Sequence, residues 1–135
     1  MASPAGRLDE TFAALRRILA RHEKTLLVQI DEADGYQLAS RSMNDRVGRP
    51  LFVAALQKRK SYVSFHFMPV YTCPELVRDL SPALKKRMQG KSCFNFKSID
   101  DDAIEELTQL TKKGLARFKN IALPWADQGK AKSRS

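Results

Sequence analysis

The sequence is short of cysteine and glycine and has no long apolar run. Its 135 residues include two cysteines, Cys73 and Cys93, too few for a disulfide framework. No segment approaches the roughly 20 apolar residues of a membrane-spanning helix, and residues 1–7 lack the apolar core of a signal peptide. The six glycines are scattered and form no phosphate-binding loop. We therefore expect a cytoplasmic protein with no membrane association, because thiols stay reduced in that compartment.

Acidic residues are also scarce relative to basic ones. The 15 Asp and Glu residues face 24 Lys and Arg residues, which gives a formal net charge of +9. Such a surface attracts polyanions, including nucleic acid and phosphorylated metabolites. The basic clusters fall at an expected hairpin tip and two expected helix ends, without interleaved aromatic residues, at positions 58–60, 85–87 and 112–113. Nucleic-acid binding is therefore an alternative function and not the first one.

The overall composition is that of a globular chain. Hydrophobic residues make up 43% and charged residues 29% of the sequence. A chain of this length suggests one domain and buries about two thirds of its unfolded surface, so it needs no metal or disulfide to fold. We assign residues 1–126 to this domain. Residues 127–135, with one glycine and three basic residues, are expected to be a disordered basic tail.

Apolar residues at helical spacing predict a helix near each end of the chain. The first covers residues 8–22, and its apolar positions are Leu8, Phe12, Leu15, Ile18 and Leu19. The last has an apolar stripe from Ile104 to Phe118 and follows three aspartates at 100–102, where a helix dipole favours negative charge. Two short helices are expected between them. Thr72 and Glu75 have capping-box spacing around Pro74, and Ser81 precedes Pro82 as a second N-cap, with Gly90 as the residue after the helix.

Alternating apolar and polar residues predict strands over 26–30, 36–41, 51–57, 61–68 and 92–97. Asp34-Gly35 is a strong hairpin signal, residues 58–60 form a charged turn, and Pro69 ends the fourth strand because it lacks an N–H. The element order predicts an α+β fold. We expect an antiparallel sheet of about five strands, with the N- and C-terminal helices packed on one face and the other face open.

The most informative segment is the last strand, 92–97, with Lys91 before it. If Phe94 and Phe96 face the helices, period two turns the intervening residues toward the open face. The fourth strand repeats this pattern with Val63, Phe65 and Phe67 facing inward. A ligand-binding face with mixed polar chemistry is therefore predicted, formed by Tyr62, Ser64, His66, Lys91, Cys93, Asn95 and Lys97.

The sequence patterns that would indicate catalysis or metal binding are weaker than the pattern that indicates a ligand-binding face. Cys93 with His66 could form a nucleophile and base only if their strands are neighbours. The two cysteines and two histidines lack the local spacing of a structural zinc site. No carboxylate pair has the setting of a hydrolase. We therefore expect a binding domain without catalysis, and no cofactor is indicated.

Three segments of the chain resemble a known family. Residues 62–71 (YVSFHFMPVY), 80–90 (LSPALKKRMQG) and 91–97 (KSCFNFK) closely resemble the YdhG-like domain of unknown function, and the likeness is strong from about Arg49 to Phe118. The resemblance implies an uncharacterised bacterial cytoplasmic protein with a fold similar to frataxin. One branch of the wider family is described as an iron chaperone, which implies an iron or metal carrier as an alternative. Frataxin-type iron binding uses an acidic first helix, whereas the first helix here is basic.

The function expected from the sequence is thus the binding of a small, possibly anionic, ligand or a partner on the open sheet face. The two alternatives are an iron or metal carrier of the frataxin type and a nucleic-acid-binding module that uses the basic clusters.

Overall fold

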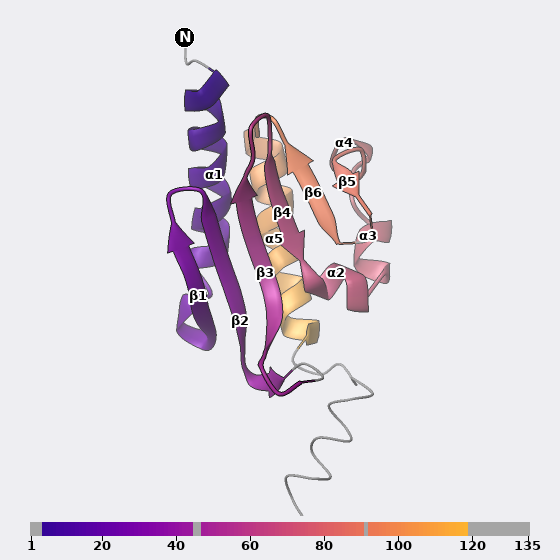
Figure 1. Ribbon diagram of the computed structural model, residues 1–135. Coiled ribbons are helices and arrows are strands. Elements are labelled where there is room, and N and C mark those ends of the chain that lie inside the picture. The colour runs from indigo at the N-terminus through magenta and orange to yellow at the C-terminus, as the bar shows by residue number, and fades with distance from the viewer. Residues whose placement is uncertain (1–3, 45–46, 91, 119–135) are drawn as a thin grey trace, which may run out of the picture.

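Six antiparallel strands form one sheet, and the two long helices lie against one of its faces (Figure 1). The computed structural model describes residues 4–44, 47–90 and 92–118. The long helices are α1 (Pro4–Ala20) and α5 (Asp101–Phe118), which lie behind the sheet in Figure 1 and contact each other. The predicted α+β class, with an antiparallel sheet and terminal helices on one face, is confirmed. The predicted tail at 127–135 lies outside the described residues.

The sheet has the strand order β1-β2-β3-β4-β6-β5. The first four strands run along the chain as β1 (Leu26–Glu32), β2 (Gly35–Asn44), β3 (Pro50–Lys58) and β4 (Val63–Phe67), each antiparallel to the next. Strand β6 (Cys93–Phe96) then pairs with β4, and β5 (Met88–Gln89) pairs with the outer side of β6. Strand β5 has only two residues, too few for a period-two pattern, which is why the sequence indicated about five strands.

Three short helices, one more than predicted, connect β4 to β5: α2 (Met68–Thr72), α3 (Glu75–Arg78) and α4 (Pro82–Lys85). Pro69 does not simply end a strand. It lies in the first turn of α2, where its missing N–H is tolerated. The predicted capping box is wrong: the Thr72 hydroxyl donates to the Pro69 carbonyl (3.2 Å), and Pro74 occupies the N-cap of α3 without a side-chain bond. The Ser81 cap is confirmed, since its Oγ accepts from the Leu84 N–H at 3.2 Å.

Gly90 has a role that the sequence did not predict. It follows β5 with a φ of 75°, in the left-handed region that favours glycine. It therefore turns the chain between β5 and β6 and does not end a helix. This turn returns the chain along β5 and brings β6 alongside β4.

The core lies between the sheet and the long helices. Phe65 packs against Phe67 and Phe94, with ring centroids 5.9 and 6.2 Å apart, and all three are fully buried. Gly114 of α5 lies so close to β4 that an added Cβ would come within 2.5 Å of the Phe67 ring. Burial of each large apolar side chain contributes about 1.5–3 kcal/mol. The positions of β4 and β6 are therefore fixed from the helix side.

A group of charged residues joins α1 to the first hairpin. The Arg16 guanidinium binds the Asp31 carboxylate (2.9 and 3.2 Å) and stacks over the Tyr36 ring at 4.7 Å. The Tyr36 hydroxyl donates to Glu23 at 2.5 Å. Burial, and then the hydrogen bond to the Glu23 carboxylate, raise the pKa of Tyr36 well above its usual range. We name these four residues the junction cluster. The polar groups of the junction cluster bind one another and hold α1 against the first hairpin, so they offer little to a ligand.

Candidate functional site

The face of β4 and β6 that points away from the helices carries polar side chains. In β4, buried Ser64 and half-buried His66 alternate with the fully buried apolar residues Val63, Phe65 and Phe67. In β6, Cys93 and Asn95 are half-buried while Phe94 and Phe96 are buried. Burial therefore alternates along β6 as predicted, whereas in β4 only His66 is less than fully buried. The open face is the one turned toward the viewer in Figure 1, since α1 and α5 lie behind the sheet.

The register of β4 and β6 places these four polar residues in two cross-strand pairs. Ser64 lies opposite Asn95, and His66 lies opposite Cys93. The Ser64 hydroxyl donates to the Asn95 Oδ1 at 3.1 Å, and His66 Nε2 lies 3.7 Å from Cys93 Sγ. The Cys93 thiol also donates to Asn95 Oδ1 at 3.5 Å. We call Ser64, His66, Cys93 and Asn95 the open-face cluster.

The open-face cluster is electrically neutral at physiological pH. Burial lowers the pKa of His66, and the nearby Arg59 guanidinium lowers it further. Burial raises the pKa of the Cys93 thiol, and a contact with the Ser64 hydroxyl opposes this shift in part. The thiol therefore stays protonated and the imidazole stays uncharged. A cysteine nucleophile needs the opposite arrangement, because the thiolate is the reactive form.

Three of the seven predicted site residues fall outside this cluster. The β4–β6 ladder ends at the pair of Val63 and Phe96, so Tyr62 and Lys97 lie just beyond it. Tyr62 is half-buried and Lys97 is exposed, and no side-chain hydrogen bond joins either one to the cluster in the described part of the chain. Lys91 lies outside the described residues. The structure thus brings together Ser64, His66, Cys93 and Asn95.

Two residues that the sequence did not single out lie beside the cluster. Gln57 of β3 is opposite Ser64, and its Oε1 accepts from Arg59 Nη2 at 2.6 Å. Arg59 also acts on the charge state of His66. Sequence reasoning treated residues 58–60 as one solvated turn. The register of the β3–β4 hairpin was the signal that could have placed Gln57 next to Ser64.

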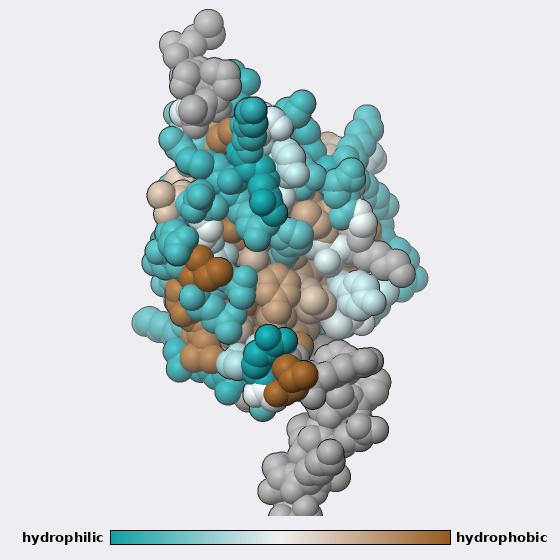
Figure 2. All heavy atoms as spheres, viewed as in Figure 1, coloured by the Kyte–Doolittle hydropathy of each residue, from teal (hydrophilic) through white to brown (hydrophobic). Residues whose placement is uncertain are grey.

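A hollow of about 240 Å³ lies beside Gln57 and Arg59, between the two hairpins. Its lining carries charges of both signs: Glu32 and Asp34 from the first hairpin, and Lys58 and Arg59 from the second. Figure 2 shows hydrophilic surface concentrated toward the β3–β4 turn and apolar surface over β1 and the middle of β3. Strand β1 contains two of the exposed large apolar residues, Val28 and Ile30. The β3–β4 end of this face is therefore its hydrophilic part, and it carries charges of both signs.

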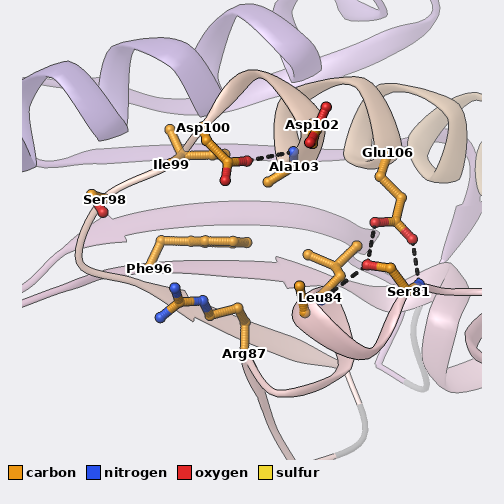
Figure 3. Close-up of a pocket in the computed structure, with 11 residues that line it drawn as sticks. Ser81, Leu84, Arg87, Phe96, Ser98, Ile99, Asp100, Asp102, Ala103 and Glu106 are labelled. Atoms are coloured by element: carbon orange, nitrogen blue, oxygen red, sulfur yellow. Dashed lines mark hydrogen bonds between the residues drawn. The ribbon is translucent and has the colours of Figure 1, made fainter.

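A second cavity, of about 360 Å³, lies between α4, β6 and the start of α5 (Figure 3). Glu106 accepts from the N–H and the hydroxyl of Ser81 (2.6 and 2.7 Å), and Asp100 accepts from the Ala103 N–H at 2.8 Å. These carboxylates therefore fasten α4 to α5 and cap α5. Arg87 lines the same cavity. Its polar groups mainly serve the fold, so we do not regard it as the primary site.

Among the described residues, no group of three or more His, Cys, Asp or Glu side chains is placed so that it could hold a metal ion. Cys73 and Cys93 are both free thiols. None of the helices in the described ranges is long and apolar enough to cross a membrane.

Comparisons of the chain with protein-family models, with curated proteins and with solved structures found no match. The resemblance to the YdhG-like domain and the likeness to frataxin therefore stay predictions from the sequence.

Proposed function

We propose that this chain is a non-catalytic binding domain of the YdhG-like kind, located in the cytoplasm, that holds a small anionic ligand at the open-face cluster. The observation that carries the proposal is the cross-strand pairing of Ser64 with Asn95 and His66 with Cys93, next to Gln57, whose side chain binds the Arg59 guanidinium. Two of the segments that resemble the family, 62–71 and 91–97, include these strands. The two free thiols fit a reducing compartment.

An anion is the ligand class that suits these groups. The Ser64 hydroxyl and the Cys93 thiol both donate to Asn95 Oδ1, and the Asn95 amide N–H₂ has no protein acceptor in the described part of the chain. Arg59 adds a permanent positive charge, and its guanidinium is suited to two-pronged contacts with a carboxylate or phosphate. The net charge of +9 raises the local concentration of any anion.

The protonated thiol and the neutral imidazole favour binding over catalysis. We expect Cys93 in a Cys73→Ala background to react with iodoacetamide more slowly than a free cysteine thiol at neutral pH, because its pKa is raised. Mass spectrometry of the labelled protein measures the rate. Rapid labelling that depends on His66 would instead indicate an activated nucleophile.

The binding test uses inorganic phosphate, citrate and AMP as probes. We expect at least one probe to raise the melting temperature and to shift the amide resonances of residues 64–66 and 93–95. The His66→Ala/Asn95→Ala variant should lose both effects. The matched control is Gln29→Ala/Gln37→Ala, which removes a hydrogen-bonded pair (2.7 Å) from β1 and β2. A probe that binds both variants equally, or no response to any probe, contradicts the proposal.

Two cations of the β3–β4 turn allow a controlled test of whether probe binding requires the positive charge of Arg59. Arg59→Gln removes the cation that is bound to Gln57, whereas Lys60→Gln removes the neighbouring cation of the same turn. We expect only Arg59→Gln to weaken probe binding. The two alternatives give different outcomes: nucleic-acid binding would weaken steeply with salt for both variants, and a metal carrier would bind ferrous iron in calorimetry without regard to either residue.

A further inference from the structure

An apolar groove lies at the far end of the sheet from β1. Four consecutive elements, α2, α3, α4 and β5, form its walls, and it measures about 830 Å³. Its lining residues are Val70, Tyr71, Pro74, Val77, Arg78, Lys85 and Met88. This groove is separate from the open-face cluster, with which it shares no residue.

The floor of the groove belongs to the core, while its rim faces solvent. Val70 is 1% exposed, and Val77 and Met88 are partly buried against the core. Tyr71 is 55% exposed and is one of the few large hydrophobic side chains that the described residues leave open to solvent. An exposed aromatic ring beside a firm apolar floor is typical of a surface that docks another protein.

The charges around the groove are all of one sign. Arg78 and Lys85 stand at its rim, and its described lining contains no Asp or Glu. Lys85 Nζ donates to the Arg78 carbonyl at 3.2 Å, which holds the ammonium group near the rim. No carboxylate within the described ranges forms an ion pair with either side chain. Both cations are therefore available to a partner.

Helix α3 divides its charges between two sides. Glu75 binds Arg117 of α5 at 2.9 Å, and Glu75 and Asp79 line a different cavity that faces α5. Val77 and Arg78 line the groove instead. The acidic residues of this segment are thus directed away from the groove, and the positive potential at its rim is not neutralised locally.

We propose that this groove docks a peptide segment of a partner protein in which an apolar anchor residue is flanked by Asp or Glu. The aliphatic floor takes the anchor, Tyr71 covers it, and Arg78 and Lys85 bind the flanking carboxylates. A single aromatic ring and two cations over an aliphatic floor suit a peptide better than a nucleic acid, which needs several stacking rings along a basic track.

The test selects peptides from a random phage-displayed library on the immobilised full-length chain. We expect enriched sequences with an aromatic or aliphatic residue next to Asp or Glu. Synthetic, fluorescein-labelled versions should bind Tyr71→Ala and Arg78→Glu/Lys85→Glu at least about tenfold more weakly by anisotropy. Circular dichroism and melting curves establish that both variants are folded.

The control is Lys112→Glu/Lys113→Glu on α5, which changes the net charge by the same amount away from the groove. Its affinity should stay within about twofold of the parent chain, as expected for distant surface charges. The proposal is overturned by an absence of enrichment, by enriched peptides that lack acidic residues, or by equal losses in both charge-reversed variants. A labelled oligothymidylate that competes for the groove and binds more tightly than the peptides would assign it to nucleic acid instead.

Discussion

The two faces of β4 and β6 differ in how their residues are held. On the helix side, Phe65, Phe67, Phe94 and Phe96 are at most 1% exposed and interact only through packing. On the open side, Ser64, His66, Cys93 and Asn95 contact one another through a few polar contacts between side chains. Neighbouring residues of one strand therefore differ in role: one set determines stability, and the other is the set that we propose binds a ligand.

The largest effect should separate two adjacent residues of β6. Phe94→Ala removes a fully buried ring and should lower the free energy of unfolding by about 3–5 kcal/mol. Asn95→Ala removes a half-buried amide that accepts from the buried Ser64 hydroxyl, and it should cost about 1–2 kcal/mol. Urea denaturation followed by circular dichroism measures both values. Equal costs would mean that the open face is as tightly constrained as the core.

The next effect tests how closely α5 approaches the helix side of the sheet. Gly114→Ala places a Cβ within 2.5 Å of the Phe67 ring and 3.0 Å of Pro69 Cβ. The ring and the helix must shift, and overpacking of this kind costs about 1–3 kcal/mol. In an exposed helix the same change would stabilise by roughly 0.5–1 kcal/mol. The sign of the change in unfolding free energy therefore decides between close packing and ordinary helix propensity.

A smaller effect of opposite sign is expected at Thr111 of α5. Its side chain is fully buried, and its hydroxyl is the only buried side-chain polar atom without a partner in the described part of the chain. A buried unsatisfied hydroxyl costs about 1–3 kcal/mol, and valine has nearly the same shape. Thr111→Val should therefore raise the unfolding free energy by about 1 kcal/mol. A loss of stability would show that a bound water or another group satisfies the hydroxyl.

The sequence predicted the two faces well because period two decides the side of each residue within a strand. Phe94, Asn95 and their neighbours could be assigned from alternation alone. Alternation says nothing about which strands are neighbours, and β4 and β6 are separated by three short helices and β5. The contact of His66 with Cys93 and the place of Arg59 therefore needed the structure.

Local patterns failed where competing partners were close in the chain. Thr72 matched a capping box, but it ends helix α2, and its hydroxyl donates to the Pro69 carbonyl of that helix. Gly90 matched a helix end, but the two-residue strand β5 intervened. Both errors lie in the connection between β4 and β6, where the elements have two to five residues and are too short to show a periodic pattern in the sequence.

The smallest expected effect concerns the pH dependence of the open face. The pKa of His66 is lowered in the folded chain, mainly by burial, so the unfolded chain takes up a proton first as pH falls below about 6.5. Proton uptake by the unfolded state lowers stability. The contribution of His66 to the free energy of unfolding should be fully present above that pH. It should be lost as the pH falls from about 6.5 to the folded pKa of His66, with no further change below that pKa.

Replacement of His66 isolates this contribution. The difference in unfolding free energy between the parent chain and His66→Gln should change between pH 7.5 and 5, in the direction that makes the parent relatively less stable in acid. A bound anion should reduce the change, because it favours the protonated imidazole and raises its folded pKa. A difference that is independent of pH would mean that His66 is as solvated in the folded chain as in the unfolded one, and the open face of β4 would then be less buried than the structure indicates.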